Sequence, residues 1–286
     1  MNHDVLYNKE LFLEQTIERL GTNPIDYAEK LEVAGQKGQI IDHQLKAGVL
    51  LLLSFCENNT PDKGGEGELF FRLIKRSRHI AQAGDLACPG GMLYPKWDLP
   101  IKKLITSGFM PLLKNKAGRC VRRRDRRTFH AITLFLANAA REAWEEIRLN
   151  PFRMLFLGPL PSCSLHVFPR TIFPLVGFVN GGLSFRPGYE VERIVDIPVR
   201  IFFQQENYGT LTTVRDNDPH RSVNSAETLP CLRYRDPEGR ENILWGATFL
   251  VVASFLKIVF DFQIPKGQPG LTFNKILDAR YLSGEQ

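Results

Sequence analysis

The spacing of hydrophobic positions along the chain predicts a mixed series of helices and strands. Residues 8–35 have the three-to-four-residue spacing of two amphipathic helices, with Asn23 expected to cap and Pro24 to start the second one. A similar spacing predicts a long helix over 128–147, and the apolar run 249–260 predicts a buried helix. Extended, mostly apolar runs predict strands at 47–55, 68–75, 153–160, 171–180, 191–204 and 228–235. Strands on both sides of a central helix, with another helix near the end, favour an α/β fold, an α/β/α sandwich around a mixed sheet.

Composition places the chain among ordinary globular proteins. The hydrophobic fraction is 43% and the charged fraction 24%, so the chain has ample material for a core. The first twenty residues hold several charges and no apolar signal segment, and the run 249–260 is too short to span a bilayer. Five cysteines form no C-x-x-C pair, which indicates reduced thiols. We therefore expect a cytoplasmic protein without a membrane partner.

The net charge of +6 is concentrated in one segment. Residues 99–128 carry ten Lys or Arg and a single acidic residue, Asp125, so the remainder of the chain is slightly acidic. The densest part is 122–127, which is Arg-Arg-Arg-Asp-Arg-Arg. This cluster could bind a phosphate-rich substrate, contact nucleic acid, or form a solvated or interface loop. Nucleic acid is the weakest of these, because Phe129 is the only aromatic residue beside the cluster.

Three glutamates are the strongest chemical signal in the sequence. Glu142, Glu145 and Glu146 are spaced so that a helix would place their carboxylates on one face, within a turn of each other. Such carboxylates repel unless a cation joins them, and hard oxygen ligands suit Mg²⁺. A solvated acidic face is the plain alternative. The upstream Pro-Gly-Gly at 89–91 adds weight to a site, because glycines let a backbone approach a ligand closely.

These two pieces resemble the Nudix box, G-x5-E-x7-R-E-U-x-E-E-x-G-U, where U is aliphatic. Gly91 fits the opening glycine, Arg141 and Glu142 fit the central pair, and Glu145 and Glu146 fit the paired glutamates. Further segments resemble the coenzyme A diphosphatase branch of that family, namely Leu-Ile-Lys-Arg-Ser at 73–77, Leu-Gly-Pro-Leu-Pro-Ser at 157–162, Phe-Pro-Leu-Val-Gly at 173–177, Glu190 and Val191 leading to Ile-Pro-Val at 197–199, and Trp-Gly-Ala-Thr at 245–248.

The chain departs from the box pattern at three places. Trp97 stands where the box has a glutamate that orients the arginine, and Asp98 is the nearest candidate to replace it. The box is also lengthened by 36 residues before Arg141, and Arg148 replaces the closing glycine. The resemblance implies an N-terminal helical extension at 1–44, a Nudix domain at 45–262 with its insertion at about 98–133, and a C-terminal tail at 263–286.

The resemblance implies a metal-dependent hydrolase that cleaves the pyrophosphate linkage of a nucleoside diphosphate derivative. Mg²⁺ or Mn²⁺ would be held by Glu142, Glu145 and Glu146 with the Gly90 carbonyl. Glu142 is the first choice for the residue that takes a proton from water, and Glu190 is the second. An exposed acidic residue without a catalytic role is the alternative for Glu190.

The same resemblance gives expectations about substrate and partners. Lys75 and Arg76 would contact substrate phosphate, although a solvated pair at a strand end is the alternative. The expected substrate is coenzyme A or an acyl derivative, with NADH, ADP-ribose or a dinucleoside polyphosphate as alternatives. A Nudix-fold binding protein with little turnover is a third possibility. The partners expected are a small nucleotide and, for a possible homodimer, a second copy of the chain.

Overall fold

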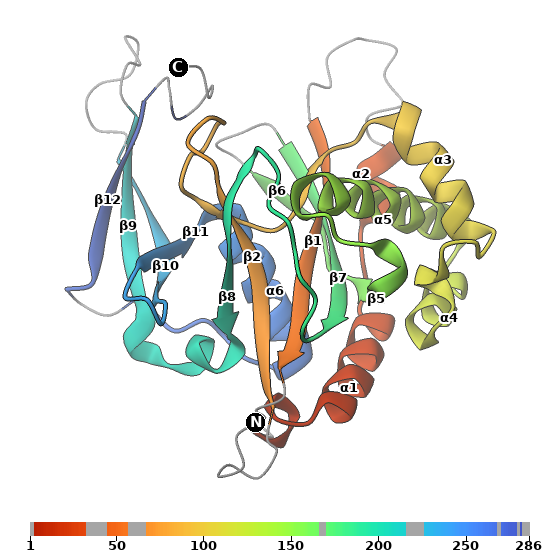
Figure 1. Ribbon diagram of the computed structural model, residues 1–286, viewed down its shortest axis with the longest axis horizontal. Helices are drawn as coiled ribbons and strands as arrows, with labels where there is room; N and C mark the ends of the chain where they lie inside the picture. Colours follow the sequence, from red (N-terminus) through yellow and green to blue (C-terminus); the bar gives the residue numbers. More distant parts are fainter. Residues whose placement is uncertain are drawn as a thin grey trace.

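The computed structural model describes residues 3–32, 45–56, 67–165, 170–215, 226–267, 270–278 and 281. Within these residues the chain folds into two sheets flanked by helices (Figure 1). The central sheet contains β1 (Leu45–Cys56), β2 (Glu68–Arg76), β3 (Leu86–Ala87), β4 (Gly90–Met92), β5 (Leu155–Pro159), β6 (Cys163–Leu165), β7 (Arg170–Asn180) and β8 (Val191–Pro198). The second sheet contains β9 (Tyr208–Arg215), β10 (Glu227–Arg235), β11 (Glu241–Trp245) and β12 (Thr272–Leu277).

The central sheet is mixed, as the sequence predicted. β1 lies at its centre and pairs in parallel with β7 and antiparallel with β2 and β4. β2 in turn pairs antiparallel with β3 and β8, and β7 pairs antiparallel with β5 and β6. Leu50 to Leu53 of β1 are fully buried, which fits a strand covered on both faces.

The longer connections form helices. The α-helices are α1 (Lys9–Thr22), α2 (Tyr27–Glu32), α3 (Pro95–Thr106), α4 (Lys116–Arg122), α5 (Arg126–Ile147) and α6 (Gly246–Phe260). The 3₁₀ helices are η1 (His3–Leu6), η2 (Pro111–Leu113), η3 (Pro151–Arg153), η4 (Val199–Phe203) and η5 (Gln205–Asn207). The expected strand at 191–204 is therefore wrong in its second half, where Pro198 ends β8 and η4 begins.

Two helices cover opposite faces of the central sheet, which confirms the α/β sandwich. Gly48 of β1 faces α5, because its amide donates to the Asn138 side chain at 2.7 Å. The next residue, Val49, points to the other side and lines a cavity with Thr248 and Val251 of α6. Successive residues of a strand point to opposite faces, so this pair of neighbours places the sheet between the two helices.

The N-terminal helices share this core. Phe12 and Leu20 of α1 and Tyr27 of α2 are fully buried, and the Tyr27 hydroxyl donates to the Pro174 carbonyl of β7. The break between the helices differs from the prediction, because Asn23 closes α1 and α2 begins only at Tyr27. The last residues of the expected extension, 33–44, lie outside the described part of the chain. At the other terminus, β12 from the expected tail pairs with β9.

The expected insertion contributes no strand within its described residues, but it is packed against the core. Leu112, Leu113 and Val121 are buried there. Arg124 donates to the carbonyls of Leu20, Gly21 and Asn23, which lie at the C-terminal end of α1. Arg124 thus satisfies carbonyl groups that a helix end leaves without partners.

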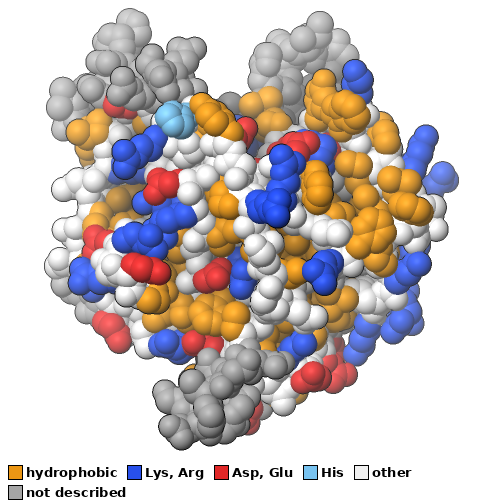
Figure 2. Space-filling model, in the orientation of Figure 1, with side chains coloured by type: hydrophobic (Ala, Val, Ile, Leu, Met, Phe, Trp, Pro, Cys, Tyr) orange, Lys and Arg blue, Asp and Glu red, His pale blue; other side chains and the backbone are white. Residues whose placement is uncertain are grey.

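The rest of the basic cluster is on the surface. Figure 2 shows Lys and Arg side chains along the edge of the molecule where Figure 1 places α3 and α4. Arg122, Arg123, Arg126 and Arg127 are exposed, which is compatible with all three interpretations of the cluster, whereas Arg124 is engaged at the end of α1.

Two expectations from composition can be compared with the structure. All five cysteines are free thiols. The described helices include none that is both long and apolar enough to span a bilayer.

Candidate functional site

One face of α5 holds the loop between β3 and β4 against the central sheet. Asn138, Glu142 and Glu146 are four residues apart, so they project from successive turns of the same face. The Asn138 side chain accepts from the Gly48 amide and donates to the Met92 carbonyl at 3.0 Å, which fixes β4 beside β1. The sequence interpretation missed Asn138, although its spacing from Glu142 is the signal that could have found it.

Glu146 is an ionisable group in an apolar place. Its side chain is only 5% exposed, and one carboxylate oxygen accepts from the Gly90 amide at 3.0 Å. Burial raises the pKa of Glu146 to about 8, with Glu142 and Glu190 adding to the rise and the Gly90 amide and Arg76 opposing it. Burial therefore disfavours the charged carboxylate at this position.

Glu142 lies one turn earlier, directly over Gly91. A Cβ atom built on Gly91 would come within 2.5 Å of the Glu142 carboxyl carbon, so only glycine leaves room for that carboxylate. Burial also raises the pKa of Glu142; Arg141 opposes this rise and the neighbouring Glu145 adds to it. The two carboxyl groups that face the Gly90–Gly91 backbone therefore both have raised pKa values, so each is protonated more readily than an exposed glutamate.

Arg141 joins three carboxylates on the adjoining side of α5. Its guanidinium donates to Asp98 at 2.8 Å and to Glu145 at 3.0 Å, and it lies 2.8 Å from a Glu142 oxygen. Burial disfavours the charge on Arg141, but these three carboxylates outweigh it and raise its pKa. The guanidinium is therefore a fixed positive charge beside Glu142.

Asp98 takes the position that the sequence left open. It is fully buried, accepts from the Arg141 guanidinium with one oxygen, and accepts from the Tyr94 amide at 2.6 Å with the other. Trp97, by contrast, is 57% exposed. The acidic residue that orients Arg141 thus lies one residue later than the box pattern, because the first turn of α3 turns Asp98 toward α5.

The loop after β7 closes the C-terminal end of α5 and brings up Glu190. The amide of Gly188 donates to the Glu146 carbonyl at 2.7 Å, and the amide of Arg186 donates to the Ile147 carbonyl at 3.1 Å. Glu190 follows two residues later and is close enough to raise the pKa of Glu146. The side chain of Glu190 is exposed, which is compatible both with a catalytic role and with an acidic surface residue that has no catalytic role.

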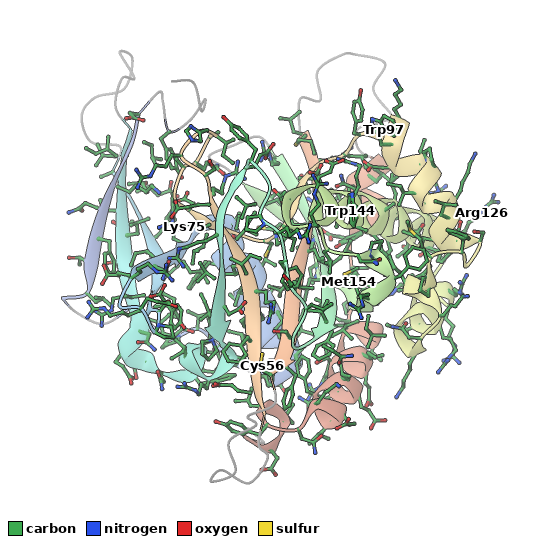
Figure 3. All side chains as sticks on the ribbon, viewed as in Figure 1. Cys56, Lys75, Trp97, Arg126, Trp144 and Met154 are labelled. Atoms are coloured by element: carbon green, nitrogen blue, oxygen red, sulfur yellow. The ribbon has the colours of Figure 1, made fainter. Side chains whose placement is uncertain are left out.

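The two basic residues expected to meet substrate lie in different surroundings. Arg76 lines a cavity with Gly90 and Gly91 and is close enough to Glu146 to oppose the rise in its pKa. The Lys75 ammonium instead lies 3.7 Å from a Glu192 oxygen. Figure 3 shows Lys75 well separated from Trp144 of α5. Only Arg76 is brought to the glutamates.

The sequence interpretation also missed Arg170, the first residue of β7. Arg170 lines the same cavity as Arg76, between β1, β4 and the start of α6. Burial lowers the pKa of Arg170, and the positive charge of Arg76 lowers it further. Nothing in the spacing around Arg170 marks it, since the pairing of β1 with β7 brings it to the site from far along the chain.

The donor set fits a divalent cation in part. Among the described residues, no three Asp, Glu, His or Cys side chains converge as a ready metal cluster. Glu142 and Glu146 supply two hard oxygen donors whose pKa values are raised, chiefly by burial. Mg²⁺ often uses only one or two carboxylates together with substrate phosphates, so these two are sufficient. One oxygen of Glu145 accepts from Arg141 at 3.0 Å, so Glu145 stays a predicted third ligand.

Comparisons with known proteins give only distant likenesses. No protein-family model matches the sequence, and a search of curated proteins finds no relative. Solved structures with similarity include an Ap4A hydrolase binary complex from C. elegans, with 12% identity, a TM-score of 0.32 and coverage of 55% of this chain and 81% of that one.

Two further solved structures are similar at the same level. A Nudix hydrolase from Alicyclobacillus acidocaldarius is 13% identical, with a TM-score of 0.33 and coverage of 56% of this chain and 81% of that one. The Nudix domain of Shewanella oneidensis NrtR, complexed with ADP ribose, is 12% identical, with a TM-score of 0.32 and coverage of 60% of this chain and 84% of that one. At these identities and TM-scores, a function for this chain follows only from the residues of its site.

Proposed function

We propose that this chain is a Nudix-type hydrolase that cleaves the pyrophosphate linkage of a nucleoside diphosphate derivative with the help of Mg²⁺ or Mn²⁺. The observation that carries the proposal is the arrangement of α5 over the Gly90–Gly91 backbone. Glu142 and Glu146 face that backbone, and Arg141 is held beside them by Asp98. Gly91, Arg141, Glu142 and Glu146 also carry the resemblance to the Nudix box.

Glu142 and Glu146 are the residues that would hold the metal ion, with the Gly90 carbonyl as a further oxygen donor. A bound divalent cation supplies neutralisation of charge on the non-bridging phosphate oxygens and lowers the pKa of a bound water. Glu145 is the remaining predicted ligand. One of its oxygens accepts from Arg141 at 3.0 Å, so Arg141 and a cation would share this carboxylate.

The remaining roles belong to side chains that orient groups or move protons. Arg141 keeps the Glu142 carboxylate against Gly91, and Asp98 keeps Arg141 in place. A general base works best when its pKa lies near the working pH, and burial shifts the pKa of Glu142 in that direction. Glu190 is the second candidate base, since it approaches Glu146 from the loop on the other side.

The finer proposal for the substrate is coenzyme A or an acyl derivative. It is supported by the sequence segments that resemble the coenzyme A diphosphatase branch and by Arg76, which lies beside the glutamate face. Substrate contact by Lys75 remains a prediction from that same resemblance. We further propose a cytoplasmic location and a homodimer as the expectations to test with the purified protein.

The experiment is a hydrolysis panel with purified protein, with and without Mg²⁺ or Mn²⁺. The panel contains coenzyme A, an acyl derivative, NADH, ADP-ribose and a dinucleoside polyphosphate. Metal-dependent release of two phosphorylated products from any of them supports the hydrolase proposal, and the best substrate decides the branch. No turnover of any compound, together with measurable binding of one, would assign a binding protein instead.

A further inference from the structure

Two arginines, Arg76 and Arg170, line the cavity behind Gly90 and Gly91, together with Thr248 of α6. Among the described residues, Arg170 lies within ion-pair distance of no carboxylate, and its buried Nε has no hydrogen-bond partner. Arg76 donates its Nε hydrogen to the Ala81 carbonyl at 2.9 Å.

The start of α6 adds to this positive field. The helix has fifteen residues, and Trp245 at its N-cap provides no side-chain hydrogen bond to the first turn. Its first amide groups therefore lack a capping side chain, and the helix dipole places partial positive charge at this end. Ala247 and Thr248 of that turn line the cavity.

The shape of the cavity limits what it can hold. Its volume is about 110 Å³, well below the roughly 300–1,000 Å³ of pockets that enclose a whole small-molecule ligand. The cavity therefore suits one compact group. Gly90 and Gly91 form part of its wall, where the absence of side chains lets such a group approach the backbone.

We propose that Arg76, Arg170 and the N-terminal turn of α6 form a phosphate-binding subsite, which takes a phosphoryl group. Two guanidinium groups and a helix N-terminus are the donors that recognise a phosphate dianion. The Arg170 guanidinium lines the cavity and has no carboxylate partner among the described residues, so a bound oxyanion would supply the counter-charge that it lacks. The phosphoryl group comes either from the substrate, which rests on the proposed function, or from free inorganic phosphate.

The first arm of the test measures binding of inorganic phosphate by isothermal titration calorimetry. Wild type, Arg170→Gln, Arg76→Gln and a control, Arg126→Gln, are compared; Arg126 is exposed, and Figure 3 shows it at the outer edge of the molecule. We expect wild type and the control to bind alike, and each cavity variant to bind roughly tenfold or more weakly, as the loss of a charge-assisted hydrogen bond predicts.

Thermal unfolding separates this loss from misfolding. Removing an unpartnered donor should leave Arg170→Gln at or above the wild-type melting temperature without phosphate, while the rise that phosphate gives wild type should disappear. No phosphate binding by wild type, or equal binding by Arg170→Gln and wild type, would overturn the subsite. Neither result depends on whether the protein hydrolyses any diphosphate.

The second arm identifies the source of the phosphoryl group. With whichever compound of the panel is hydrolysed, a higher KM and a similar kcat for Arg170→Gln would show that the substrate itself occupies the subsite. An unchanged KM, with loss of inhibition by added inorganic phosphate, would assign the subsite to free phosphate. Both results support a phosphate subsite, and an unchanged KM with unchanged inhibition would contradict it.

Discussion

Arg141 and Arg170 lie on the two sides of the Gly90–Gly91 backbone, and their surroundings are opposite. Arg141 is in contact with three carboxylates, which raise its pKa. Arg170 meets no carboxylate within ion-pair distance among the described residues, and burial lowers its pKa. A buried charge that is already paired with carboxylates can hold other side chains in position, whereas an unpaired buried charge can bind a ligand of opposite charge.

The acidic residues show the same difference. Asp98 is fully buried, but both of its oxygens accept hydrogen bonds, from Arg141 and from the Tyr94 amide. Glu146 is nearly as buried, and burial raises its pKa to about 8 although the hydrogen bond from the Gly90 amide opposes the rise. We infer that Asp98 orients Arg141, whereas the buried Glu146 carboxylate is the one that a bound cation would stabilise.

The largest effect is expected from breaking the Asp98–Arg141 pair. Asp98→Ala should lower the free energy of unfolding by about 3–5 kcal/mol, because it removes a fully buried acceptor that both the Arg141 guanidinium and the Tyr94 amide use. Trp97→Ala, one residue earlier and exposed, is the control and should change it by about 0.5 kcal/mol or less. Urea unfolding of both variants measures the difference. Equal stability of the two would refute the role given to Asp98.

The second-largest expected effect is a pH dependence of the stability of the fold, which arises from the ionisation of Glu146. The folded state holds this proton up to about pH 8, whereas a glutamate in the unfolded chain releases it near the ordinary pKa of 4.5. Between those values the folded state binds more protons, so stability falls as the pH rises. At about 1.4 kcal/mol per pKa unit, the fall amounts to a few kcal/mol.

Glu146→Gln removes this proton and keeps an oxygen for the Gly90 amide. In EDTA, raising the pH from 5 to 8 should therefore lower the free energy of unfolding of Glu146→Gln by less than that of wild type. Glu29→Gln on the exposed side of α2 is the matched control and should follow wild type. Identical pH profiles for Glu146→Gln and wild type would show that Glu146 ionises normally.

The smallest effect on stability distinguishes the two glycines. A Cβ on Gly90 would lie 2.5 Å from the Gly48 carbonyl oxygen, so Gly90→Ala should cost about 1–3 kcal/mol. A Cβ on Gly91 meets the end of the Glu142 side chain, which can move. We expect Gly91→Ala to be the milder change in unfolding experiments but to displace Glu142 and reduce turnover. Full turnover of Gly91→Ala would remove Glu142 from the site.

Local patterns sufficed to predict the fold class and part of the site. Apolar spacing predicted the long helix ending at Ile147 and the buried helix ending at Phe260, and both are confirmed. The glutamate spacing also placed Glu142 and Glu146 on one helical face, because that relation depends only on the period of a helix.

The parts that escaped prediction depend on contacts between distant segments. Arg170 reaches the cavity through the parallel pairing of β7 with β1, and Asp98 reaches Arg141 through the packing of α3 on α5. Arg124 was part of an apparently solvated cluster, yet it caps α1 from about a hundred residues away. No periodicity within a single segment records such contacts.

The central claim is that the Glu146 carboxylate supports metal-dependent hydrolysis, and its most direct test is the steady-state turnover of Glu146→Gln with Mg²⁺. The substrate is the best diphosphate of the panel, and Glu29→Gln is the control. We predict turnover lower by about a hundredfold or more in a folded Glu146→Gln protein, since losing one charge from such a site removes transition-state stabilisation, and normal turnover in the control. Near-normal, Mg²⁺-dependent turnover of Glu146→Gln would contradict the claim.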